Sequence, residues 1–142
     1  MPLSSARSKQ RKHALRILFE IDINKTSIDE VLEGKRMSGE QIPGEFAVSL
    51  ARGVLEKRDF IDGVISEYSE GWEISRMPVV DRNILRMALF EIFFCEDVPV
   101  GACINEAVEL AKVFSTEDSG KFINGMLGRI YRDVESGKIS LP

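Results

Sequence analysis

The stretch from Val79 to Cys95 constrains the fold more than any other part of this 142-residue chain. Between Ile84 and Cys95 only Arg86 and Glu91 are polar, so a helix formed here is apolar around most of its circumference. Such a helix has to be covered by other elements on several sides. It is too short for a membrane span, which needs about 20 apolar residues, and it is interrupted by two charges. The stretch therefore predicts the central helix of an α-helical core.

The remaining sequence supplies amphipathic segments that can pack around this helix. Helical spacing of apolar residues predicts a helix over 5–24, a second after Ser27, a long third over 45–70, and two more over 104–114 and from 115–119 onward. The first of these helices is expected to bury Ala14, Leu15, Leu18 and Phe19 on one face. Residues 34–44 read as a loop, and Gly71 stands where a C-terminal cap belongs. No segment shows strand alternation, so we expect an all-α helical bundle of about six or seven helices.

Length and cysteine content narrow the class of protein. A chain of this length suits one domain with a substantial core, or two small helical halves that share one. Cys95 and Cys103 lie among apolar residues, which favours buried thiols over a disulfide or a metal site, because no CxxC spacing is present and His13 is the only histidine. No segment resembles a signal peptide, so we expect a cytoplasmic protein.

Catalytic and cofactor-binding motifs are not apparent in the sequence. Gly120-Lys121 matches two residues of the phosphate-binding loop motif, but Ser115 and Phe122 occupy the places where that loop needs a glycine and a serine or threonine. The acidic pairs read as helix-terminal or loop charges, with no nucleophile or base beside them. We therefore expect a protein that is not an enzyme and has no cofactor and no metal.

Positive charge is concentrated at the N-terminus of an otherwise acidic chain. The net charge is −4, yet residues 1–19 contain no acid and hold Arg7, Lys9, Arg11, Lys12 and Arg16. Such a cluster can contact phosphates and bind nucleic acid in a salt-dependent way, although a solvated helix end is the alternative. Lys121 beside Phe122 could add a stacking platform for single-stranded RNA, with core packing of Phe122 as the alternative.

A second candidate surface lies on the central helix. Arg82, Arg86 and Phe90 follow one another at intervals of four residues, so they share one stripe of the helix, which Asp81 adjoins. Arginine combined with an aromatic residue is typical of a protein-binding hot spot. The alternative is that the arginines are solvated or paired internally.

Several of these segments resemble the NusB family of bacterial transcription antitermination factors. The resemblance is carried by VDRNILR at 80–86, DVP at 97–99, INEAVELAK at 104–112 and EDSGKFINGML at 117–127. The N-terminal segment 7–19 is similar to the arginine-rich opening helix of that family. The similarity extends from about residue 5 to residue 133, and it is ungapped and most specific between 79 and 127.

The resemblance implies a single NusB-like domain over 1–142, with an N-terminal helical subdomain at about 5–71 and a C-terminal one at about 79–136 that share a core. Such a protein would bind the boxA element of ribosomal RNA leaders together with NusE, a small-subunit ribosomal protein. With other Nus factors it would help RNA polymerase to read through terminators. By position, the resemblance assigns RNA contacts to Arg7, Lys9, Arg11, Lys12, Lys121, Phe122 and Asn124. It assigns NusE contacts to Asp81, Arg82, Arg86 and Phe90.

Two departures from the family pattern bear on RNA affinity. Ser8 and Lys9 follow Arg7 where consecutive arginines are common, and Phe19 stands where tyrosine is common. Alternatives to the RNA-binding hypothesis are a helical scaffold with an incidental basic end and a NusB-like domain of a ribosomal RNA cytosine methyltransferase. The sequence has neither the Rossmann-type domain nor the glycine loop of the methyltransferase. Some members of the family also form dimers, so a homodimer stays open.

Overall fold

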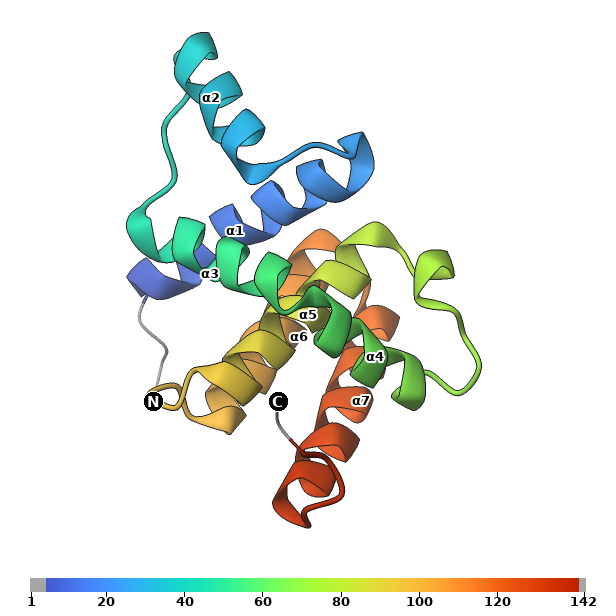
Figure 1. Cartoon of the computed structure of the whole chain (residues 1–142). Coiled ribbons are helices and arrows are strands. Elements are labelled where there is room, and N and C mark those ends of the chain that lie inside the picture. The colour runs from blue at the N-terminus through green and yellow to red at the C-terminus, as the bar shows by residue number, and fades with distance from the viewer. Residues whose placement is uncertain (1–4, 141–142) are drawn as a thin grey trace. The chain divides into compact units, whose positions relative to one another are not determined.

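The computed structural model describes residues 5–140, and within them every regular element is helical. Figure 1 shows the path of the chain through these elements. The elements are α1 (Ser5–Asn24), α2 (Ile28–Ser38), α3 (Glu45–Glu56), α4 (Arg58–Tyr68), a short 3-10 helix η1 (Ile74–Arg76), α5 (Val79–Phe94), α6 (Val100–Phe114) and α7 (Glu117–Glu135). The predicted all-α class is confirmed. None of the helices in this described range is long and apolar enough to cross a membrane.

The chain divides into two compact units, one ending at Glu56 and the other beginning at Lys57. In the first unit, α1 packs against both α2 and α3. Ile17 and Leu18 of α1 are buried, as are Leu50 and Val54 of α3. The subdomain boundary expected between residues 71 and 79 stays a prediction.

One predicted core residue of α1 lies at the surface. Phe19 is 39% exposed, whereas Ala14 and Leu15 are buried as expected. Each residue of a helix is rotated by about 100° from the one before it. Because Ile17 and Leu18 fill the buried face, Phe19 is turned out of it. The prediction that Phe19 belongs to the core was therefore wrong.

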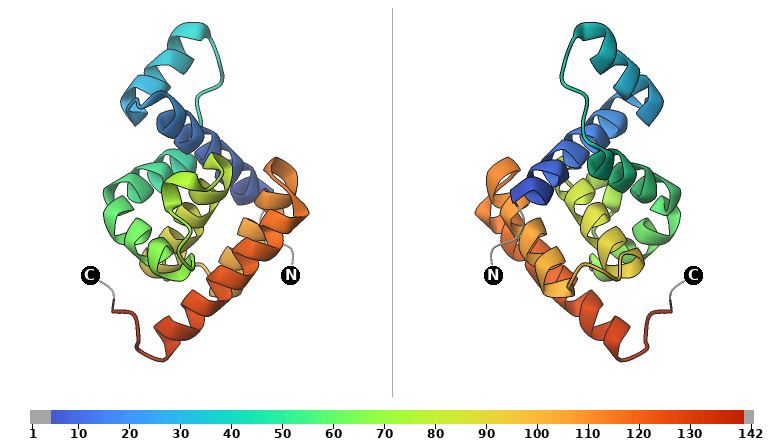
Figure 2. Two further views of the ribbon diagram at one scale, coloured as in Figure 1. Left: turned by 90° about the vertical axis from the view of Figure 1, so that its right-hand side faces the viewer. Right: turned by 90° about the vertical axis from the view of Figure 1, so that its left-hand side faces the viewer.

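In the second unit, α5 is the central helix that the sequence predicts. It packs against α4, α6 and α7, and α6 also packs along α7, as Figure 2 shows for the orange and red segments. Ile84, Leu85 and Leu89 of α5 have no exposed surface. Cys103 is buried and Cys95 is half-buried, and both of these described cysteines are thiols outside any disulfide.

The long helix predicted over 45–70 is two helices. The backbone leaves helical geometry at Lys57, where φ is −102° and ψ is 10°. The break falls in the charged run from Glu56 to Asp59, whose side chains are all exposed, so no buried contact holds the helix straight there. Apolar periodicity continues on both sides of the break, which is why the sequence suggested one helix.

The other helix ends differ from prediction by a few residues. Helix α2 continues to Ser38 and ends at Gly39, whose φ of +77° closes the helix in the left-handed conformation, so the expected loop starts later. Helix α6 begins at Val100, directly after Pro99, which fits proline's preference for helix starts. Ser69 caps α4 instead of the expected Gly71.

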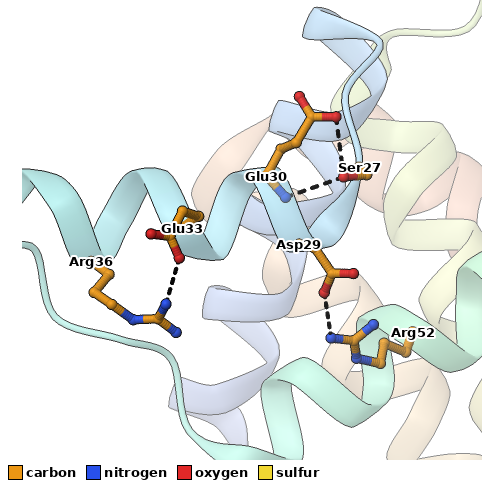
Figure 3. Close-up of polar contacts among 6 residues, drawn as sticks. All are labelled: Ser27, Asp29, Glu30, Glu33, Arg36 and Arg52. Carbon is orange, nitrogen blue, oxygen red and sulfur yellow. Dashed lines mark hydrogen bonds and ion pairs between the residues drawn. The ribbon is translucent and has the colours of Figure 1, made fainter.

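Helix α2 is held by polar contacts at its start (Figure 3). At its start the Ser27 hydroxyl accepts a hydrogen bond of 3.1 Å from the Glu30 backbone N–H, which satisfies one of the unpaired donors of the first turn. Arg52 of α3 reaches Asp29 at 2.8 Å. These contacts join α2 to its own unit in addition to its short apolar edge.

Candidate nucleic-acid and protein interfaces

The basic segment of α1 presents most, but not all, of its cations to solvent. Arg7, Lys9 and Lys12 are exposed, as predicted for residues that meet a ligand. Arg11 is only 3% exposed. Arg11 is therefore not exposed with its neighbours, because its position on α1 turns it toward α3.

A single aromatic ring of α3 receives two of these arginines. The Cζ atoms of Arg7 and Arg11 lie 4.5 Å and 5.5 Å from the centroid of the Phe46 ring. A guanidinium over an aromatic face is attracted by the ring quadrupole. This contact positions both guanidinium groups against the start of α3.

The position of Phe46 depends on a contact between α1 and the start of α3. The side-chain oxygen of Gln10 accepts a hydrogen bond of 3.3 Å from the backbone N–H of Ala47, one of the donors that the first turn of α3 leaves unpaired. A Cβ atom on Gly44 would come within 2.5 Å of that Gln10 oxygen. Glycine at position 44 therefore makes room for the side chain that caps α3.

The first unit also contains a pocket of about 280 Å³. It is lined by His13, Arg16, Lys35, Glu40, Gln41 and Pro43. The His13 Nδ1 atom is buried and has no hydrogen-bond partner among the described atoms. Burial, followed by the charges of Arg16, Lys9 and Lys35, lowers the pKa of His13 below its usual 6.5. The wall of the pocket thus combines the cations Arg16 and Lys35 with an imidazole whose pKa is lowered.

In the second unit, the N-terminus of α7 gathers the other predicted RNA-binding residues. Thr116 caps the helix by accepting a hydrogen bond of 3.0 Å from the Ser119 backbone N–H. Lys121 and Asn124 are exposed and both line a hollow of about 340 Å³. Phe122 is half-buried. The first turns of one helix therefore hold a cation, an amide and an aromatic ring close together.

The predicted protein-binding stripe on α5 is only partly accessible. Asp81 and Arg86 are buried, whereas Arg82 and Phe90 are half-buried. Arg86 donates to both carboxylate oxygens of Asp62, at 2.8 Å and 3.0 Å. Internal pairing, one of the two alternatives open from the sequence, therefore describes Arg86.

The two half-buried members of the stripe have neighbours of different kinds. Arg82 donates to the backbone oxygens of Ile74 and Ser75, each at 3.3 Å. The Phe90 ring lies 5.5 Å from that of Phe94. Both side chains keep some surface in the isolated chain, so they are the members of the stripe that a partner can reach.

Asp81 connects the start of α5 to the start of α7. Its Oδ2 atom accepts a hydrogen bond of 2.7 Å from the Ser119 hydroxyl, and its Oδ1 atom is buried with no hydrogen-bond partner among the described atoms. Ser119 also belongs to the cap of α7. Asp81 therefore fixes the helix end that carries Lys121 and Phe122.

Sequence reasoning missed three residues that shape these surfaces: Gln10, Phe46 and Trp72. Phe46 was assigned only to the apolar periodicity of its helix, and Gln10 gave no signal, because its role depends on a contact with α3. Trp72 stood in a connection between predicted helices. Its size and its position next to Gly71 were the available signals.

Comparison with known proteins gives the family. The NusB family model matches residues 8–132, most of the chain. The chain belongs to the NusB family. This confirms the membership predicted from the motifs.

Individual relatives are similar over nearly their whole length. The transcription antitermination protein NusB of Pelotomaculum thermopropionicum is 47% identical over 132 residues, which cover 92% of each chain. That of Pseudarthrobacter chlorophenolicus is 43% identical over 126 residues, covering 89% of this chain and 93% of the relative.

Solved structures of NusB proteins have the same fold. NusB of T. maritima superposes with a TM-score of 0.79 at 36% identity and covers 94% of both chains. A crystal structure of the antitermination factors NusB and NusE in complex with double-stranded RNA also matches. Its TM-score is 0.79 at 26% identity, and the match covers 92% of this chain and 98% of that one.

Proposed function

We propose that this chain is an RNA-binding transcription antitermination factor without enzymatic activity. It binds the boxA element of ribosomal RNA leaders together with NusE, joins other Nus factors on RNA polymerase in the cytoplasm, and supports reading through terminators. The observation that carries the proposal is the pair of α1 arginines placed on the uncharged ring of Phe46 in a member of the NusB family. The relative solved with NusE and double-stranded RNA supports the choice of partners.

On the RNA side, the exposed cations Arg7, Lys9 and Lys12 make phosphate contacts from α1. Arg11 is buried, so it acts by adding positive potential beneath them and by fixing the α1 surface against Phe46.

From α7, Lys121 adds a further phosphate contact, Asn124 offers donors and acceptors to a base edge, and Phe122 offers part of its ring for stacking. These roles combine electrostatic attraction, which is independent of sequence, with groups that can distinguish bases.

On the NusE side, the contact is made by Arg82 and Phe90, which keep accessible surface. Asp81 and Arg86 support the same surface from below through Ser119 and Asp62. Substitution of Arg82 or Phe90 should weaken NusE binding while leaving the fold intact. Substitution of Asp81 or Arg86 should lower stability as well.

The proposal is tested by fluorescence anisotropy with labelled boxA-type RNA and a scrambled RNA of equal length, with and without NusE, at several salt concentrations. We expect tighter binding to boxA RNA, further strengthened by NusE. The logarithm of the binding constant should fall linearly with the logarithm of salt concentration.

The Arg7→Ala variant should weaken binding and reduce the salt slope by about 0.7, the value for one phosphate contact on a single strand. Arg36→Ala is the matched control, because Arg36 is an exposed arginine of the same unit paired with Glu33 (Figure 3). Salt-insensitive binding, or no binding even with NusE, contradicts the proposed function. Equal and weak binding to both RNAs would identify a general electrostatic patch and favour a scaffold.

A further inference from the structure

Trp72 is a half-exposed aromatic residue in the connection between α4 and α5. Its side chain is 42% exposed. Its ring meets that of Phe122 edge to face, with the centroids 5.5 Å apart and the planes at 69°. This geometry is favourable for an aromatic pair, and it leaves part of the Trp72 ring open beside a residue already proposed to meet RNA.

The backbone around Trp72 is held firmly. The buried Ser69 donates its hydroxyl to the Trp72 carbonyl oxygen at 2.7 Å, and the Trp72 N–H donates to the Ser69 carbonyl oxygen at 3.1 Å. Between them, Glu70 and Gly71 are both left-handed, with φ of +54° and +85°. A left-handed glutamate is uncommon, so the turn keeps a costly conformation that presents Trp72. A side chain fixed in advance loses little freedom when a ligand stacks on it.

A hollow of about 380 Å³ adjoins the tryptophan. It is lined by Ser66, Ser69, Gly71, Trp72, Glu73, Ile74 and Ser75. Trp72 and Ile74 therefore make one wall of the hollow aromatic and apolar, and exposed hydroxyl and carboxylate groups lie on its other walls. This combination suits a flat heterocycle that has a π face and hydrogen-bonding edges, as a nucleobase has.

The carboxylates beside Trp72 can serve as acceptors for the edge of a base. Glu70 and Glu73 are exposed beside Trp72, and each carboxylate lies within 4.0 Å of an arginine side chain. A carboxylate accepts hydrogen bonds from the exocyclic amino groups of adenine, cytosine or guanine. The positive charge of Lys121, next to Phe122, is available for the adjoining phosphate.

We propose that Trp72 and the adjoining hollow form a nucleobase-binding subsite that extends the Phe122 surface and takes one unpaired base of the bound RNA. The inference rests on the proposed function, because it assigns a subsite for the same ligand. It adds a recognition residue from outside both α1 and α7.

The test uses the emission of Trp72, which is the only tryptophan of the chain. Labelled boxA-type RNA is titrated into the full-length protein while label anisotropy reports binding and tryptophan emission reports stacking. We expect quenching of Trp72 with the same midpoint as the anisotropy change. Trp72→Leu should raise Kd by roughly 5- to 150-fold, the effect of losing one base–aromatic stack.

Two further variants separate stacking from folding. Trp72→Phe keeps an aromatic face and should recover most of the affinity lost in Trp72→Leu. Tyr131→Leu removes an aromatic ring farther along α7, where the Tyr131 hydroxyl donates to Glu135 in the next turn, and should leave Kd unchanged. Circular dichroism establishes whether each variant is folded. If Trp72→Leu does not fold, the quenching of Trp72 emission and the affinity of Trp72→Phe test the subsite instead.

The outcomes are distinct for the two proposals. Normal anisotropy with unchanged Trp72 emission and unchanged Kd in Trp72→Leu overturns the subsite and leaves the proposed function standing. No change in anisotropy at any salt concentration, with or without NusE, overturns the proposed function and the subsite together. An equal loss of affinity in Trp72→Leu and Trp72→Phe without quenching would assign Trp72 a packing role and also reject the subsite.

Discussion

Removal of Asp62 should destabilise the second unit much more than removal of Asp29 destabilises the first. Both aspartates pair with an arginine at 2.8 Å, and Arg86 also donates to the second oxygen of Asp62 at 3.0 Å. They differ in burial: the Arg86 and Asp62 side chains are 9% and 24% exposed, whereas those of Arg52 and Asp29 are 46% and 78% exposed. A comparison of Asp62→Ala with Asp29→Ala therefore measures the combined effect of burial and of the second hydrogen bond.

The expected loss in the free energy of unfolding depends on which groups each substitution leaves without a partner. Removing one partner of a buried ion pair costs about 3–5 kcal/mol. Here Asn83 still accepts from Arg86 at 3.1 Å, and the partial exposure of Asp62 lets water approach the guanidinium. We therefore expect Asp62→Ala to lower the free energy of unfolding by about 2–3 kcal/mol.

The exposed Arg52–Asp29 ion pair should contribute far less to stability. Surface ion pairs contribute about 0.2–1 kcal/mol, and Asp29 adds a small favourable interaction with the start of α2. We expect Asp29→Ala to cost about 1 kcal/mol at low salt. Because salt screens exposed charges, this loss should nearly disappear at about 1 M salt, whereas the loss in Asp62→Ala should persist.

Urea unfolding followed by circular dichroism measures both variants, and the melting temperature of Asp62→Ala should fall by about 5–10 °C. The double variant Asp62→Ala/Arg86→Met should recover part of the loss, because no unpaired buried charge remains. Equal, salt-sensitive losses in the two single variants would refute the reasoning. They would return Arg86 to the set of residues available for NusE.

Two further predictions concern titration. Burial and the hydrogen bond to Asp133 raise the pKa of Tyr68 to about 12. The stabilising contribution of Tyr68 should therefore be complete below pH 10 and be lost as the pH rises toward 12. Ultraviolet titration should show the Tyr68 phenol ionising late, and Tyr68→Phe should remove that step. The pKa of His13 is lowered by burial and by nearby cations, Arg16 foremost, so stability should fall as the pH drops below about 6.5. Proton NMR of this single histidine should show a pKa that rises when RNA phosphates bind, and an unchanged pKa would contradict phosphate contact at the nearby Lys9.

The parts of the fold that were predictable are those encoded by neighbouring residues. Helix α5 was evident because its apolar residues surround the helix, and the start of α2 was evident because Ser27 precedes an amphipathic segment. The break at Lys57 was not predictable as a helix end, because apolar periodicity continues across it.

The candidate site was predictable only as far as residue type allowed. The basic segment of α1 could be identified from charge alone. The burial of Arg11 could not, because it depends on the position of Phe46 in another helix. The pairing of Arg86 with Asp62 likewise joins two helices, and nothing in the spacing of the α5 stripe distinguishes Arg86 from Arg82.

The contact of Gln10 with the start of α3 means that the basic segment of α1 cannot be transferred to another protein without α3. A peptide with the sequence of α1, or the same residues grafted onto another helix, would carry the charge but lack the ring that arranges it. Such a graft should keep a salt-dependent attraction to any RNA and lose preference among RNAs. Transplanting recognition would require α1, the Gly44 turn and the first turn of α3 together.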